Sequence, residues 1–230
     1  MRVQGQDYRT VWMDGGAIKT IDQRLLPHRF EIVALADHRQ TAEAIREMTV
    51  RGAPAIGAAA AYGLAQVYRE APATGPERAA YIQEGFERLR ATRPTAANLF
   101  FALERVRGAA EIADPSRQAE AALAAAEKMV DEDVEACRRI GEVGAALIGE
   151  GARVLTHCNA GWVACVDWGT ALAPIYVAHR AGRKVRVFAD ETRPRCQGSN
   201  LTAWELMQEG VAVEIIADNA AGLLMRRGEV

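Results

Sequence analysis

The chain has 230 residues and half of them are hydrophobic, which is enough to bury one large core or two small ones. Its formal charge of −2, from 28 basic and 30 acidic side chains, excludes an overall electrostatic attraction to nucleic acid or to an anionic membrane. The four cysteines form no CxxC pair or zinc-finger spacing, and the N-terminus has no recognisable secretory signal, so we expect a cytoplasmic protein.

Three extended runs near the N-terminus predict a small antiparallel sheet. Residues 8–13 and 17–21 are separated by Asp14-Gly15-Gly16, and the glycines can supply the positive φ angles that a tight hairpin requires. Residues 30–35 can add another strand. We therefore expect a small β-hairpin at the beginning of a domain that is otherwise helical.

Five helices are predicted in the first 150 residues. Asp37 or Thr41 can cap the first helix, and Thr95 can cap the fourth. The second is uncharged but shorter than a membrane span, which favours a packed interior helix. The fifth keeps apolar steps of three and four, with one break expected near Asp131 or Gly141. The five helices cover about residues 38–49, 52–68, 77–90, 96–107 and 117–149.

Two arginines precede predicted helix starts and are candidate phosphate ligands. Arg51 stands before Gly52, which lets the backbone approach a ligand, and before Pro54, which suits the first turn of a helix. Arg93 belongs to a loop, because the following Pro94 disfavours the helical conformation. The unpaired amides of a helix N-terminus favour an anion. A solvated charge before a buried helix is an equally good interpretation of Arg51.

From residue 153 onward the chain repeats a strand, a turn and a helix three times. The first apolar run predicts a buried strand, and glycines end each of the helical segments. Alternating units of this kind specify a parallel, doubly wound sheet with right-handed crossovers. The predicted strands are residues 153–157, 184–189 and 211–217, and the predicted helices are residues 162–180, a segment ending near residue 209, and residues 220–227.

These patterns predict an α/β protein in three parts. Residues 1–130 form a mostly helical N-terminal domain with the small hairpin, residues 131–150 a connecting helix, and residues 151–230 a Rossmann-like domain. Glu229-Val230 has the character of an approach to a fourth strand, without which the third strand would lie at a bare sheet edge. We therefore expect the 230 residues to be part of a longer chain, with the parallel sheet cut short after three β-α units.

Cys158 lies in the turn Thr-His-Cys-Asn-Ala-Gly between the first predicted strand and its helix. Ligands of open α/β sheets bind beyond the carboxyl ends of the strands, and a helix N-terminus lowers the pKa of a thiol placed there. Cys158 is therefore a candidate base or nucleophile, and the alternative is a small buried hydrophobic residue. We expect His157 to be a packed, hydrogen-bonded side chain rather than a general base.

Polar side chains follow each of the three strands, and together they predict an active site. Each has another interpretation by itself, as a solvated acidic turn, a surface charge or a helix cap. No spacing of His, Cys, Asp or Glu resembles a metal-ligand set, so we expect neither a metal nor a cofactor. The polar side chains are His157, Cys158 and Asn159; Asp190, Glu191, Arg193, Arg195 and Gln197; and Asp218 and Asn219.

Several sequence blocks resemble the methylthioribose-1-phosphate isomerase family of methionine salvage. This family is related to the alpha, beta and delta subunits of the eukaryotic translation-initiation nucleotide-exchange factor. The resemblance implies a helical N-terminal domain, a Rossmann-like C-terminal domain and a homodimer. It also implies an intramolecular oxidoreductase that converts 5-methylthioribose 1-phosphate into 5-methylthioribulose 1-phosphate. The blocks are residues 51–57 (RGAPAIG), 93–98 (RPTAAN), 156–161 (THCNAG), 189–198 (ADETRPRCQG), 201–206 (LTAWEL) and 218–221.

The resemblance also implies roles for individual residues. Cys158 is similar to the cysteine of the family's reaction centre. The family's other catalytic group, an aspartate in a Gly-Ala-Asp-Arg motif, is absent from this sequence, and Asp218 matches a different position. We therefore expect the chain alone to have an incomplete active site. The residues similar to the family's substrate contacts are Arg51, Gly52, Ala53, Arg93 and Gln197.

Two other functions stay open. A regulatory subunit of the translation-factor type would keep the fold and bind a protein or a sugar phosphate without catalysis, whereas Cys158 and the intact block at residues 51–57 favour an enzyme. A ribose-1,5-bisphosphate isomerase would need a further cationic site, whereas Asn159-Ala160-Gly161 favours the methylthio compound. We expect a small sugar phosphate as the ligand, and neither nucleic acid nor a membrane as a partner.

Overall fold

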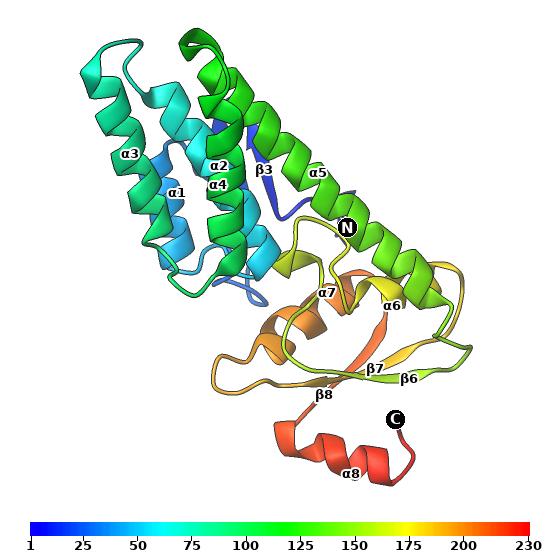
Figure 1. Ribbon diagram of the computed structural model, residues 1–230. Helices are drawn as coiled ribbons and strands as arrows, with labels where there is room; N and C mark the ends of the chain where they lie inside the picture. The colour runs from blue at the N-terminus through cyan, green and yellow to red at the C-terminus, as the bar shows by residue number, and fades with distance from the viewer. The chain divides into compact units, whose positions relative to one another are not determined.

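A computed structural model describes all 230 residues and divides them into two units, whose chain path Figure 1 shows. Helix α5 (Gln118–Ala145) contributes residues to both units. The domain boundaries expected at residues 130 and 150 stay a prediction. The helical unit comprises Val11–Arg24 and Glu31–Asp133, and the Rossmann-like unit comprises Met1–Thr10, Leu25–Phe30 and Val134–Val230.

The predicted antiparallel sheet is present in the helical unit. Strands β3 (Val11–Asp14) and β4 (Ala17–Ile21) pair around Gly15-Gly16, whose φ angles are +56° and +87°. Strand β5 (Ile32–Leu35) pairs with the other side of β4. The side chain of Ile18 on β4 is completely buried, so this sheet contributes one face to the core of the unit.

Helix α1 (His38–Arg46) begins after Asp37, the first of the two predicted caps. The Asp37 carboxylate accepts hydrogen bonds from the amides of Arg39 (2.9 Å) and Gln40 (2.8 Å). We expect Asp37→Ala to lower the free energy of unfolding by about 1 kcal/mol, because two amides lose their partner. Urea denaturation measures this change. The exposed Glu43→Ala on the same helix should stay within about 0.5 kcal/mol, and an equal loss in the two variants would contradict the capping role.

Helix α2 (Ala53–Glu70) forms the centre of the helical unit. Every residue from Ala55 to Tyr68 is buried, which confirms the predicted interior helix. Helices α1, α3 (Pro76–Arg90) and α4 (Ala97–Glu111) pack against it (Figure 1).

None of the helices combines the length and the apolar character that a membrane crossing requires.

Two predictions about the later helices are wrong. Thr95 does not cap α4, which begins after Ala96 with no side chain bonded to its first amides. Helix α5 is unbroken, although the sequence favours a break near Asp131 or Gly141. Gly141 serves close packing instead, because a Cβ added there would lie 3.0 Å from the side chain of Val177.

The predicted parallel sheet is present in the Rossmann-like unit, with the order β6-β7-β8. Strand β7 is central and mostly buried. Strand β6 is a half-buried edge strand, so the prediction of a buried strand is wrong at this position. A two-residue hairpin, β1 (Arg2–Val3) and β2 (Gln6–Asp7), was not expected from the sequence. The main elements are β6 (Arg153–Thr156), α6 (Ala173–Arg180), β7 (Arg186–Asp190), α7 (Ala203–Gln208), β8 (Ala212–Ile216) and α8 (Ala221–Arg226).

The helix predicted over residues 162–180 is much shorter, because α6 begins only at Ala173. Before it, the chain makes one 3-10 turn at Trp162–Ala164 and then follows an irregular path. Two local signals favour the late start: Gly169 has a φ of +78°, and Pro174 lies in the first turn of α6. The turn that carries Cys158 is therefore not directly followed by a long helix.

Candidate functional site

Groups from three loops meet at the carboxyl ends of the parallel strands. Nδ1 of His157, after β6, lies 2.9 Å from Oδ2 of Asp190, the last residue of β7. The amide of Cys158 donates to Oγ1 of Thr192 at 2.8 Å. The carboxylate of Asp218, after β8, accepts the amide of Thr192 at 2.7 Å. The three loops that the sequence places after successive strands therefore lie together.

Cys158 is half-buried and has a left-handed backbone with a φ of +66°. Hydroxyl groups hold it on both sides: its N–H donates to Thr192, and its carbonyl accepts Oγ1 of Thr202 at 2.6 Å. The long helix that the sequence predicts directly after this turn does not form there, because α6 begins only at Ala173. The catalytic role of Cys158 stays a prediction. Its partial exposure also argues against the alternative of a buried hydrophobic side chain.

His157 is more exposed than expected. Its side chain is 59% exposed, so the prediction of a packed histidine is wrong, although the expected hydrogen bond is present. Its partner Asp190 is only 5% exposed, and Oδ1 of Asp190 has no hydrogen-bond partner. A carboxylate bound to Nδ1 fixes the orientation and tautomer of an imidazole ring.

Asp218 is held in its ionised form. Hydrogen bonds from the amides of Arg193 and Thr192 lower the pKa of its carboxyl below the usual value. Ligand atoms of His157, Asp190 and Asp218 lie within 4.8 Å of one another, so these side chains could hold a metal ion. Spacing along the sequence does not reveal this group, because its members follow three different strands. Nδ1 of His157 and both Asp218 oxygens are already engaged in hydrogen bonds.

Glu205 on α7 is a completely buried carboxyl beside the Cys158 loop. Burial raises its pKa to about 7, and hydrogen bonds from Asn159 and from the amide of Trp162 oppose this increase. The amide of Trp162 lies 2.7 Å from Oε2. The sequence analysis missed Glu205. The feature that could have revealed it is a single acidic residue within the otherwise uncharged block 201–206. Thr192 and Thr202 were also missed, because hydroxyl bonds to the backbone leave no sequence pattern.

The raised pKa of Glu205 predicts how the stability of the chain depends on pH. Below about pH 4.5 the carboxyl is protonated in both the folded and the unfolded states, and its contribution to stability is fully present. Between pH 4.5 and about 7 the carboxyl ionises in the unfolded state but stays protonated in the folded state. We therefore expect the free energy of unfolding to fall by about 3 kcal/mol over this range. Denaturant unfolding from pH 4.5 to 8 measures the effect as the difference between native protein and Glu205→Gln. A constant difference over this range would contradict the prediction.

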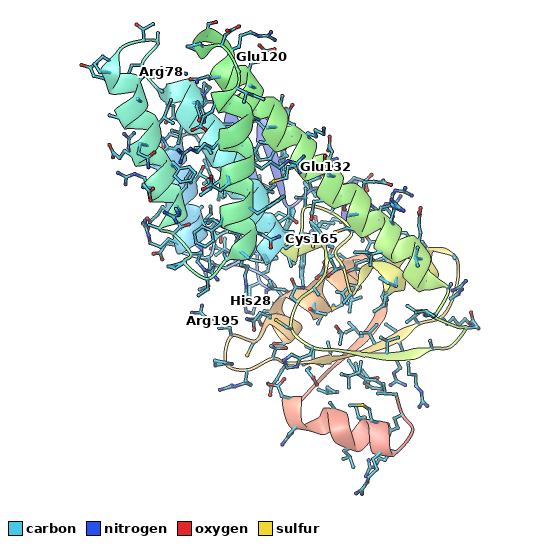
Figure 2. All side chains as sticks on the ribbon, viewed as in Figure 1. His28, Arg78, Glu120, Glu132, Cys165 and Arg195 are labelled. Carbon is cyan, nitrogen blue, oxygen red and sulfur yellow. The ribbon has the colours of Figure 1, made fainter.

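Gln197 is half-buried at the end of the loop that follows β7. The next residue, Gly198, begins a π-helical turn and lies against the carbonyl of Asp190, where a Cβ would overlap the oxygen. Gly198 also lies beside Thr192, the residue that holds the amide of Cys158. Gln197 and Cys158 are therefore on neighbouring loops. Arg195 is exposed on the same loop as Gln197 (Figure 2).

The other four predicted site residues lie at one end of the helical unit. Gly52 precedes α2 with a φ of +95°, and no side chain caps the first amides of this helix. Arg93 precedes α4, whose first amides are also without a side-chain cap. The two helix starts are adjacent, because a Cβ at Gly57 would lie 3.2 Å from the carbonyl of Asn98. Arg51, Gly52 and Ala53 thus lie at one of two adjacent helix starts, and Arg93 precedes the other.

The side chain of Arg93 supports an anion site at this end of the helical unit. Its Nη1 is buried and has no hydrogen-bond partner. Nearly all buried polar groups of native proteins have a partner, and a phosphate oxygen would supply one here. The carbonyl of Arg51 accepts Nε2 of Gln23 at 3.1 Å, which fixes the backbone before α2. Uncapped helix amides and guanidinium groups together can bind a phosphate.

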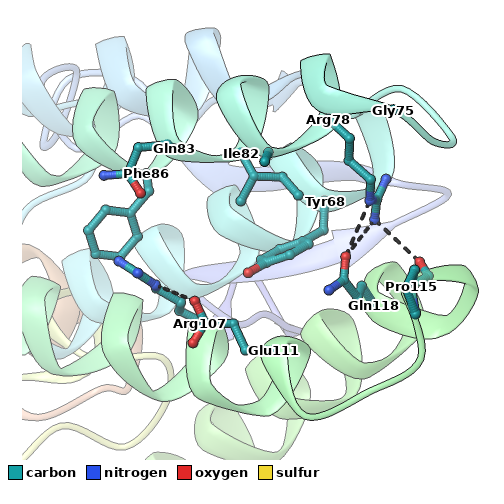
Figure 3. Close-up of a pocket in the computed structure, with 11 residues that line it drawn as sticks. Tyr68, Gly75, Arg78, Ile82, Gln83, Phe86, Arg107, Glu111, Pro115 and Gln118 are labelled. Atoms are coloured by element: carbon teal, nitrogen blue, oxygen red, sulfur yellow. Dashed lines mark hydrogen bonds and ion pairs between the residues drawn. The ribbon is translucent and has the colours of Figure 1, made fainter.

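A separate hollow of about 370 Å³ lies within the helical unit (Figure 3). Its apolar wall includes Tyr68, Ile82 and Phe86, and burial raises the pKa of the Tyr68 hydroxyl. Arg107 donates to Glu111 at 2.7 Å, and its guanidinium lies 4.9 Å from the ring centre of Phe86. None of the predicted substrate contacts lines this hollow.

These features define a two-unit α/β protein with two uncapped helix starts beside a buried arginine and a cysteine-bearing loop at the strand ends. The sequence model of the Initiation factor 2 subunit family matches residues 49–230. The chain therefore belongs to this family.

Similar proteins and similar solved structures confirm the resemblance seen in the sequence blocks. Methylthioribose-1-phosphate isomerases from Methylocella silvestris and Methylobacterium nodulans are 50% and 53% identical, over all of this chain and 64% of each relative. The structure of 5-methylthioribose 1-phosphate isomerase from Pyrococcus horikoshii OT3 is similar with a TM-score of 0.91 and 41% identity, over 98% of this chain and 64% of that one. The translation initiation factor eIF-2B, subunit delta, from A. fulgidus is similar with a TM-score of 0.84 and 43% identity, over 97% of this chain and 66% of that one. The chain thus spans 64% of the length of these isomerases.

Proposed function

We propose that the protein converts 5-methylthioribose 1-phosphate into 5-methylthioribulose 1-phosphate, an aldose–ketose isomerisation in methionine salvage. Relatives named for this activity are about half identical to the chain over its whole length. The structural observation that carries the proposal is the buried, unpartnered Nη1 of Arg93 beside two adjacent, uncapped helix starts. This arrangement suits the phosphate of a sugar phosphate.

The proposed roles divide between binding and chemistry. Arg51, Gly52, Ala53, Arg93 and Gln197 bind the substrate, and Cys158 takes part in the reaction. Phosphate on the anomeric oxygen blocks ring opening by loss of a hydroxyl proton, so the ring oxygen must be protonated instead. Hydrogen then moves from carbon 2 to carbon 1, and the carbon-2 hydroxyl loses its proton as the ketone forms. Cys158 acts as a base or stabilises the developing charge.

The acid that protonates the ring oxygen is proposed to be the aspartate of the family's Gly-Ala-Asp-Arg motif. An aspartate kept protonated in an apolar pocket suits this role. Because the motif does not occur in these 230 residues, we propose that a protein of these residues alone does not turn over the substrate.

The test uses the natural protein, whose intact mass is measured before its activity. We expect a species that carries the Gly-Ala-Asp-Arg motif to isomerise 5-methylthioribose 1-phosphate and a species of 24.9 kDa to be inactive. Ribose 1,5-bisphosphate is assayed as a second substrate under the same conditions. Faster turnover of the bisphosphate would replace the proposed substrate, and no turnover of either sugar by the motif-bearing species would refute the isomerase function.

A second candidate function is a non-catalytic regulatory subunit. The observation in its favour is the 43% identity and the TM-score of 0.84 with a structure described as a translation initiation factor subunit. Such a subunit would bind a sugar phosphate without converting it. Calorimetric binding of 5-methylthioribose 1-phosphate to a motif-bearing species with no turnover would favour this function over the enzyme.

We also propose that the protein is a homodimer, as the family resemblance implies, and that it is cytoplasmic, as its cysteine usage suggests. Sedimentation equilibrium of the natural protein should give twice the mass of one chain. A monomer at micromolar concentration would contradict this part of the proposal.

A further inference from the structure

Glu205 lies directly against the loop that carries Cys158. Its Oε2 accepts the amide of Trp162 at 2.7 Å, and its Oε1 accepts Nδ2 of Asn159. A Cβ added at Gly161 would overlap the same carboxyl group, so no side chain fits between the loop and Glu205. The carboxyl is completely buried and therefore has no direct access to a substrate.

A directed chain of hydrogen bonds leads from Glu205 to the backbone of Cys158. Nδ2 of Asn159 donates to Glu205 and also to Oγ1 of Thr202, at 3.1 Å. Because this hydroxyl oxygen accepts a hydrogen from Asn159, its own hydrogen is free to bond to the carbonyl of Cys158, at 2.6 Å. Both oxygens of Glu205 accept hydrogen bonds from the Cys158 loop, so the carboxyl orients the amide of Asn159 and thereby each following bond.

The conformation at the end of this chain needs support. Cys158 has a φ of +66°, in a region that a residue with a Cβ rarely adopts and that persists only where the surrounding structure holds it. We propose that Glu205 is a positioning residue, which holds the backbone of Cys158 and with it the thiol in the conformation used for catalysis. This proposal deepens the proposed isomerase function and rests on it.

The first experiment examines the loop without the isomerase reaction. The alkylation rate of each cysteine by iodoacetamide is followed by peptide mass mapping in the native protein, in Glu205→Gln and in Thr202→Val. Glutamine replaces one of the two acceptor oxygens with a donor, and valine removes the hydroxyl at nearly constant volume. We expect the rate at Cys158 to rise about five-fold or more in both variants, because the loop opens more often. Buried Cys137, which reports global unfolding, should react as in the native protein.

A matched control is available at the end of the same helix. Glu209 also has a nearly buried side chain, 5% exposed, but it pairs with Arg180 at 2.8 Å and has no bond to the Cys158 loop. Glu209→Gln should therefore leave the rate at Cys158 at its native value. An unchanged rate at Cys158 in Thr202→Val would overturn the proposal even if Glu205→Gln failed to fold.

The second experiment separates positioning from a structural role in the motif-bearing enzyme. We expect Glu205→Gln to lower kcat about ten-fold or more while KM stays within about three-fold, because the arginines that bind phosphate are untouched. An effect confined to KM, or the same loss of kcat in Glu209→Gln, would overturn the proposal. If the native enzyme has no turnover, the proposed function fails, and the alkylation rates still decide whether Glu205 holds Cys158.

Discussion

Cys158→Ser in the motif-bearing enzyme is expected to lower kcat about 100- to 10,000-fold, the range that a positioned acid or base contributes. A hydroxyl is a far weaker acid than a thiol, so serine is a poor proton-transfer group in the same place. The backbone bonds to Thr192 and Thr202 do not involve the sulfur, so the loop should keep its conformation. Affinity for the substrate should stay within about three-fold, because the proposed phosphate ligands are unchanged. Steady-state kinetics and calorimetric binding measure the two quantities.

The half-buried Cys196 supplies the matched control for this variant. It lies on the loop after β7 and has no bond to the Cys158 loop, so Cys196→Ser should keep native turnover. Near-normal kcat in Cys158→Ser would instead assign Cys158 a packing role. A parallel loss of binding and turnover would mean that the substitution disturbs the loop and not the chemistry alone.

Elements whose determinants are local could be predicted from the sequence. Gly15-Gly16 specifies the hairpin, Pro54 fits the first turn of α2, and the alternation after residue 153 predicts the three parallel strands. The failures have longer-range causes. The chain from Trp162 to α6 is irregular, and the amide of Trp162 donates to Glu205, which is 43 residues away in the sequence. Gly141 resembles a helix breaker, whereas in the structure it lets Val177 approach α5.

The candidate site shows the same division. Cys158 and the polar groups after each strand could be found, because strand ends and turn residues are visible in the sequence. The hydroxyl groups of Thr192 and Thr202 could not, because they act by bonding to a backbone group 34 or 44 residues away. The sequence also favours a helix-activated thiol, whereas the structure offers a conformation held by hydrogen bonds. The support of a functional loop thus depends on tertiary contacts that no local pattern encodes.

Gly198→Ala is expected to lower the free energy of unfolding by about 3 kcal/mol or more, because the new methyl group has no space. A Cβ at this position would overlap the carbonyl oxygen of Asp190, and it would lie 2.8 Å from the carbonyl carbon and 3.0 Å from Oγ1 of Thr192. Backbone atoms of a central strand cannot move aside as a flexible side chain can. The loop ending at Gln197 would have to open, so the variant should also weaken substrate binding.

Gly222→Ala provides the comparison that isolates this steric effect. Gly222 lies in helix α8 of the same unit, and a Cβ there would meet no atom within 4 Å. Alanine should therefore be neutral or stabilise the chain by about 0.5 to 1 kcal/mol, because it loses less backbone entropy on folding than glycine. Urea denaturation of the two variants beside the native protein measures the difference. A loss below about 1 kcal/mol in Gly198→Ala would show that the loop after β7 can relax away from Asp190, and the close approach would then not fix Gln197.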